Sequence, residues 1–237
     1  MDQRSLLTHP SWNGRLVVAL LVLLAVTASP AGNAESITAA FECDIPNLVI
    51  SADDRRDTKS ACEGARAAID FLAAAGLDVS GEIRIEIVAA LEGYPRHSAA
   101  GCFLASSHKV MVLRYAEFLE FEEWCGIPID RDLYRGLIAH ETSHVIAACN
   151  FKPPKPTIQA QEYIAYVTML ATMEPAQRDR VLTLFPGDGY ETEQQMNTTI
   201  YLCDPMRFGV QAYRHFLKEG NGTDFIRAIL SGKVLAE

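Results

Sequence analysis

The sequence lacks the features that mark nucleic-acid-binding and membrane-spanning proteins. Acidic side chains outnumber basic ones by 30 to 21, giving a formal net charge of −9. A general nucleic-acid binder is excluded, because such proteins neutralise phosphates with a basic stripe. No apolar run reaches the roughly 20 residues that a helix needs to cross a bilayer. Internal repeats are also missing, so we expect a single globular domain after the N-terminal segment.

The longest apolar run lies near the N-terminus, over residues 16–28, and Arg4 and Arg15 precede it. Small residues follow and end at Ala34. This pattern is typical of a secretory signal cleaved after Ala34, which predicts a signal peptide over 1–34 and a periplasmic or secreted domain over 35–237. The polar lead is long, so an uncleaved anchor that holds the protein at a membrane stays open as the alternative.

All six cysteines lie after this segment, and an even count in an exported chain predicts disulfides. The simplest hypothesis pairs each cysteine with its neighbour in the chain. The expected pairs are Cys43–Cys62, Cys102–Cys125 and Cys149–Cys203. A zinc site made of cysteines is not expected, because no C-x-x-C pair occurs.

The most informative motif is H-E-x-x-H, formed by His140, Glu141 and His144. Both histidines continue an apolar stripe with helical spacing. The stripe is Leu133, Leu137, His140, His144 and Ala148. Residues four apart share one face of a helix, so both imidazoles can reach one metal ion while Glu141 holds a water. The alternative interpretation is two hydrogen-bonded core histidines.

A catalytic zinc ion takes three protein ligands, so a third must come from elsewhere in the chain. The extended motif that ends in a third histidine is absent, since Ala147 and Asn150 occupy its remaining positions. Glu162 lies on the apolar stripe of the next expected helix, where a carboxylate is costly to bury unless paired or metal-bound. We therefore predict Glu162 as the third ligand. Alternatively, Glu162 is a surface residue on a helix that buries Tyr163, Val167 and Leu170 instead.

These residues resemble the gluzincin group of zinc metallopeptidases, which pairs H-E-x-x-H with a later Glu-x-x-Ala, here Glu162 to Ala165. The resemblance is limited to residues 137–166, and it points to the group as a whole and to none of its well-known subfamilies. It implies zinc on His140, His144 and Glu162, with Glu141 as general base and a peptide or protein as substrate. It also implies an edge strand beside the motif helix that pairs with the substrate, for which residues 109–113 are the candidate.

Two tyrosines are assigned supporting roles. Tyr166, one turn after Glu162, is the candidate that fixes a histidine tautomer, with simple core packing as the alternative. Tyr201 is the candidate donor to the oxyanion of the reaction. Other donors in the same half of the chain are Tyr190, Tyr213 and His215.

The remaining pattern predicts an α+β fold with a small mixed sheet, zincin-like according to the resemblance. Expected strands cover 47–52, 83–89, 102–105 and 109–113, the last two as a hairpin. Expected helices cover 60–75, 115–124, 130–150, a segment around Glu162, 175–184, 204–218 and 223–230. This divides the domain into an α/β part over 35–129 and a helical part over 130–237, with the active site between them.

The sequence thus favours an exported zinc peptidase. A non-catalytic zincin-like metal-binding protein and a signal-anchored envelope protein remain the alternatives.

Overall fold

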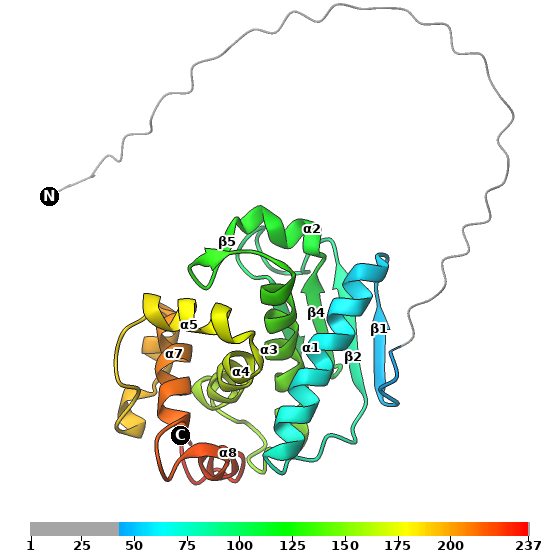
Figure 1. Cartoon of the computed structure of the whole chain (residues 1–237). Coiled ribbons are helices and arrows are strands. Elements are labelled where there is room, and N and C mark those ends of the chain that lie inside the picture. Colours follow the sequence, from blue (N-terminus) through cyan, green and yellow to red (C-terminus); the bar gives the residue numbers. More distant parts are fainter. Residues whose placement is uncertain (1–42, 237) are drawn as a thin grey trace, which may run out of the picture. The chain divides into compact units, whose positions relative to one another are not determined.

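The computed structural model describes residues 43–236 (Figure 1), so the expected signal peptide over 1–34 lies outside the described residues. Its central sheet has four strands in the order β1-β2-β4-β3, and β1, β2 and β4 run parallel. The strands are β1 (Leu48–Ser51), β2 (Ile83–Val88), β3 (Gly101–Leu104) and β4 (Lys109–Leu113). β3 returns antiparallel to β4, which confirms the expected hairpin.

The strand at the edge of the sheet is not the one that the sequence predicts. Residues 109–113 form β4, which lies inside the sheet because β2 pairs with its other side, Ile85 opposite Val110. β3 is therefore the edge strand beside the motif helix, and the prediction of 109–113 as the edge was wrong. Sequence alternation identifies a strand but not the neighbours that a crossover connection brings to it.

Two long helices, α1 (Arg55–Ala74) and α3 (Arg131–Asn150), lie side by side over the sheet (Figure 1). The expected start of the first helix at Ser60 was wrong. Asp54 caps α1 by accepting a hydrogen bond from the Arg56 amide, and Ser60 is buried within the helix. α3 begins as expected, because the Asp130 side chain accepts from the Leu133 amide.

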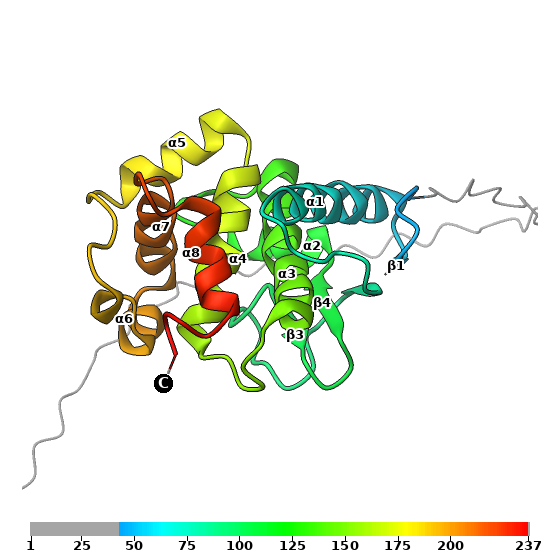
Figure 2. The same cartoon turned by 90° about the horizontal axis from the view of Figure 1, so that it is seen from below.

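The C-terminal half is helical. α4 (Ile158–Thr172) lies between α3 and α7 (Pro205–Phe216) in both views (Figures 1 and 2). α5 (Pro175–Leu184), α6 (Thr198–Cys203) and α8 (Gly222–Leu230) complete this half. A proline-rich loop over 153–156 separates α3 from α4, so α4 can fold back and bury one face against α3. Of these helices, only the short α6 was not expected.

The segment between β4 and α3 is less helical than its sequence predicts. The expected helix over 115–124 reduces to α2 (Tyr115–Phe118) and a 3₁₀ turn, η1 (Leu119–Phe121). The chain then forms a small two-stranded hairpin of β5 (Glu123–Trp124) and β6 (Ile127–Pro128). Glu122 and Cys125 adopt positive φ angles of 63° and 58°, which a helix cannot accommodate.

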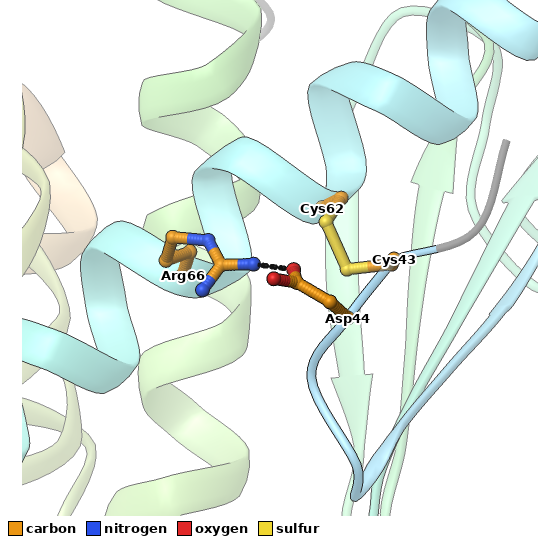
Figure 3. Close-up of a disulfide and its surroundings, with 4 residues drawn as sticks. All are labelled: Cys43, Asp44, Cys62 and Arg66. Carbon is orange, nitrogen blue, oxygen red and sulfur yellow. Dashed lines mark hydrogen bonds and ion pairs between the residues drawn. A yellow bond between two sulfur atoms is a disulfide. The ribbon is translucent and has the colours of Figure 1, made fainter.

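One of the three expected disulfides is present. Cys43 bonds to Cys62 and ties the segment before β1 to α1, where Asp44 also pairs with Arg66 (Figure 3). Cys102, Cys125, Cys149 and Cys203 are unpaired, so the other two expected disulfides were wrong.

The reason for the unpaired cysteines is their position in the fold. Cys102 packs with Leu91 and Leu113 in a small apolar cluster, whereas Cys125 lies in the main core. Cys149 lies beside Gly81, and Cys203 lies on α6, which packs against α4 and α7.

Residues 43–236 form an α+β arrangement of eight α-helices and a small mixed sheet. All of these residues belong to one compact unit. Within the same residues, no helix is both long enough and apolar enough to cross a membrane.

Candidate metal centre

The two histidines of the motif lie side by side on the buried face of α3. His140 and His144 are 7% and 8% exposed, and their Nε2 atoms are 3.3 Å apart. Residues four apart on a helix point the same way, so this proximity follows from the spacing of the motif. The Phe103 ring on β3 lies parallel to the His144 ring, with 6.3 Å between centroids. The sheet and α3 therefore jointly hold the imidazole pair.

α4 brings Glu162 to the same point. One carboxylate oxygen, Oε2, lies 3.5 Å from Nε2 of His140, and the other, Oε1, lies 3.7 Å from Nε2 of His144. Ligand atoms of the three residues all lie within 4.8 Å of one another. Thus the three residues that the sequence predicted as ligands come together in the fold.

The three side chains are of types, and lie at distances, that could hold a metal ion such as zinc. Zinc bonds of about 2.0–2.2 Å at tetrahedral angles place neighbouring ligand atoms roughly 3.3–3.6 Å apart. Nε2 of His140 lies 3.3 Å from Nε2 of His144 and 3.5 Å from Oε2 of Glu162, whereas the 3.7 Å contact of His144 is to the other carboxylate oxygen, Oε1. In addition, Oε2 of Glu162 is buried and accepts no hydrogen bond within residues 43–236. A buried carboxylate oxygen without a donor is costly unless a cation balances it. Two imidazoles and one carboxylate are also a common ligand set for catalytic zinc.

Burial sets the protonation of the ligands. It lowers the pKa of His140 well below its usual value, helped by the neighbouring His144, and it lowers the pKa of His144 to about 4. Both imidazoles are therefore neutral near pH 7, which is the form that binds metal. Burial raises the pKa of Glu162 to about 7, although the nearby Tyr201 hydroxyl acts in the opposite direction.

Glu141 lies beside the ligands on the same helix and is 6% exposed. Its side chain packs against the backbone of Gly101 at the start of β3. A Cβ atom at position 101 would lie 2.7 Å from Cγ of Glu141, so only glycine leaves room for this carboxylate. Burial, reinforced by the charge of Glu162, raises the pKa of Glu141 well above its usual value. Such a carboxylate is a stronger base than an exposed one.

Tyr201 is the one candidate oxyanion donor that lines the cleft together with His140, Glu141 and Glu162. Burial is the main cause that raises the pKa of its hydroxyl, so Tyr201 stays protonated and can donate. The other donors considered from the sequence lie elsewhere. The ring of Tyr190 packs against Phe208, and the ring of Tyr213 against Phe216. His215 contacts Tyr163.

Tyr166 contacts the site through its ring. It packs edge-on against His140 with 4.6 Å between ring centroids, and a Cβ atom on Gly209 of α7 would overlap it. Nδ1 of His140 is buried and has no hydrogen-bond partner within residues 43–236. The described contacts of Tyr166 are therefore packing contacts, and its role in fixing the tautomer stays a prediction.

The cleft has two lobes on either side of the motif. They share Ser98, Ala99, Gly101, His140, Glu141 and Tyr201. One lobe, of about 380 Å³, continues along β3 past Phe103 to Gln161. The other, of about 480 Å³, is mainly apolar, with Trp124, Phe185 and Met206 in its wall.

Sequence reasoning missed Gly101 and Phe103 as site residues. Neither lies in a motif, and their contacts arise only because β3 is the edge strand beside α3. A glycine immediately before the strand expected over 102–105 was the one available signal, since a glycine in a strand can mark a close approach by another group.

Residues 48–237 match the model of a family of unknown function, DUF6639, and the chain belongs to this family. Neither the curated proteins nor the solved structures contain a match to the chain.

Proposed function

We propose that this protein is an exported zinc-dependent peptidase of the gluzincin type. The observation that carries the proposal is the convergence of His140, His144 and Glu162 beside a buried carboxylate, Glu141, in an open cleft. The Cys43–Cys62 disulfide supports export, because disulfides persist mainly in oxidising compartments.

In this proposal His140, His144 and Glu162 hold the zinc ion. A bound zinc ion lowers the pKa of a water molecule to about 7 and polarises the carbonyl of a peptide bond. Glu141 takes the proton from the attacking water and then passes it to the leaving amine. Its raised pKa suits both steps, since the group must accept the proton and release it again. The Tyr201 hydroxyl donates to the oxygen that becomes negative.

The substrate would bind as an extended chain along β3. Among the strands of residues 43–236, β3 pairs only with β4, so its outer edge offers backbone groups to a peptide. β3 also borders the ligands, because Gly101 contacts Glu141 and Phe103 contacts His144. Main-chain pairing at this edge would bring a peptide bond of the substrate toward Glu141.

The test combines metal analysis with peptide cleavage. The purified protein should contain one zinc ion and cleave members of a peptide library, and a chelator should abolish cleavage. Glu141→Gln should keep the zinc ion and lose cleavage, whereas Glu219→Gln, an exposed control, should behave like the natural protein. Cleavage that survives Glu141→Gln contradicts the mechanism. Bound zinc without any cleavage would instead favour the non-catalytic metal-binding alternative.

A further inference from the structure

A separate cavity of about 450 Å³ lies beside the metal cleft. We propose that it is a side-chain subsite that selects a lysine or arginine residue of the substrate, with Glu117 as the residue that recognises the cation. This inference rests on the proposed peptidase function, and it names the class of peptide that the site would prefer. The volume lies within the roughly 300–1,000 Å³ typical of ligand pockets.

The cavity and the cleft are neighbours. Tyr94 and Ala99 line both of them, so one segment, residues 94–99, forms their common wall. Tyr94 is 48% exposed and stands at this boundary. A substrate residue held in the cleft can therefore direct its side chain past Tyr94 into the cavity without crossing the protein core.

The pleat of β3 explains why a side chain would point that way. Gly101 and Phe103 face α3, where they contact Glu141 and His144. Cys102, between them, points to the opposite face and packs with Leu91 and Leu113, which also line the cavity. A peptide strand added to β3 alternates in the same way, so every second side chain faces the side on which the cavity lies.

Charge identifies the side chain that fits. Within the cavity wall, Arg96 and Glu120 neutralise each other, with Nη2 of Arg96 at 2.6 Å from Oε2 of Glu120. His97 also faces Glu120, at 3.7 Å. Glu117 has no such partner: its Oε2 atom is buried and accepts no hydrogen bond within residues 43–236. Nη2 of the neighbouring Arg114 pairs with Asp53, and Nε of Arg114 is buried without a hydrogen-bond partner within the same residues. The wall therefore carries one carboxylate that forms no ion pair within residues 43–236, although the charge of Arg96 acts on it from a distance.

The apolar part of the wall suits the stem of a basic residue. Leu91, Leu113 and Phe121 surround the cavity on the sheet side. Lysine and arginine bury their methylene groups against such surfaces while the charged head reaches a polar partner. An uncharged residue of the same length would gain the apolar contacts but leave Glu117 unpaired.

The experiment separates this inference from the proposed function by measuring binding as well as cleavage. N-acetylated peptides carry a single lysine moved along the sequence, each matched with a norleucine peptide. Binding is measured with zinc-loaded Glu141→Gln protein, and kcat/KM with the natural protein. At one position lysine should improve binding and kcat/KM about 10-fold or more over norleucine. Glu117→Gln should remove this preference and leave the norleucine peptide unchanged. Glu92→Gln, an exposed control next to Leu91 of the cavity wall, should retain the preference.

The inference is overturned if lysine and norleucine peptides bind alike at every position, or if the preference survives Glu117→Gln. A norleucine peptide with a free amino terminus distinguishes the source of the cation. If Glu117→Gln weakens the binding of that peptide alone and leaves the lysine peptides unchanged, the cavity recognises the amino terminus of the chain. The assignment to a side chain is then wrong. A lysine preference in binding without cleavage of any peptide would keep the subsite and refute the peptidase function.

Discussion

Oε2 of Glu162 lies 3.5 Å from Nε2 of His140, although the two residues lie on different helices that a proline-rich loop separates. His140 is buried, and the Glu162 side chain is 14% exposed, with its Oε2 atom buried and without a hydrogen-bond donor within residues 43–236. Such a carboxylate oxygen is costly to bury unless a cation balances its charge. The relationship makes sense as two-thirds of a metal site that His144 completes.

Replacing Glu162 with glutamine should weaken zinc binding at least 100-fold, since the amide removes the negative ligand. The metal-free variant should be as stable as the natural protein or more stable, because a buried carboxylate is gone. Zinc should then raise the melting temperature of the natural protein more than that of Glu162→Gln at the same zinc concentration. Calorimetric scans with and without zinc check both expectations. Equal zinc stabilisation of the two proteins would show that Glu162 is not a ligand.

Gly101→Ala should displace the general base without removing the metal. The new Cβ atom would lie 2.7 Å from Cγ of Glu141, so the carboxylate must move. We expect kcat to fall 10-fold or more while zinc affinity is unchanged. Gly81→Ala is the matched control, because its Cβ atom would meet only Sγ of Cys149, at an ordinary 3.6 Å. Full activity of Gly101→Ala would contradict the position assigned to Glu141.

Tyr201→Phe tests the oxyanion donor. Loss of one such donor costs about 100-fold to 1,000-fold in kcat in well-studied hydrolases. We expect a decrease in kcat of about that size with little change in KM and with zinc retained. Tyr190→Phe serves as the control, since its ring packs on Phe208 away from the ligands. Equal effects of the two substitutions on kcat would remove Tyr201 from the mechanism.

His215 should make the protein less stable in mild acid. Burial, helped by the charge of Lys218, lowers the pKa of this histidine to about 4, and its Nδ1 atom lies 2.8 Å from the Tyr163 hydroxyl. Between about pH 6.5 and pH 4 the unfolded chain therefore binds a proton that the folded chain does not. The contribution of neutral His215 to the free energy of unfolding is fully present above about pH 6.5. Below that pH it falls by up to about 1.4 kcal/mol per pH unit.

The measurement for His215 is the free energy of unfolding of metal-free protein between pH 7 and pH 4. His215→Gln lacks the titrating group, so the stability advantage of the natural protein over this variant should shrink as the pH falls. An advantage that stays constant or grows would contradict the lowered pKa.

The Cys43–Cys62 disulfide should stabilise the fold, because it restricts the unfolded chain. Changing both cysteines to serine should lower the free energy of unfolding by roughly 2–4 kcal/mol in urea titrations. Cys149→Ser, at an exposed and unpaired cysteine, should change it little under the same oxidising conditions. If the double variant is as stable as the natural protein, the bond is absent or contributes nothing.

Much of the candidate centre could be predicted because it depends on local spacing. The motif placed His140 and His144 on one face of a helix, and the cost of burying a carboxylate pointed to Glu162. Both features follow from the period of a helix and the polarity of a side chain alone.

The parts that could not be predicted depend on contacts between distant segments. The order of the strands decides that β3 and not β4 is the edge, and no feature of either strand encodes that order. The disulfide pairing could not be predicted for the same reason. Cys102 and Cys125 are successive cysteines in the sequence, but in the fold they belong to different apolar clusters. The start of α1 was predicted too late because Ser60 matches the pattern of a helix cap. In the fold, Asp54 already caps the helix six residues earlier.

The most direct test of the central claim is a crystal structure of the purified protein with anomalous diffraction measured at the zinc edge. The account predicts one strong peak among Nε2 of His140, Nε2 of His144 and the carboxylate of Glu162, about 2.0–2.2 Å from each. A zinc-loaded crystal with no peak at that point, or with Glu162 turned away from it, would contradict the account.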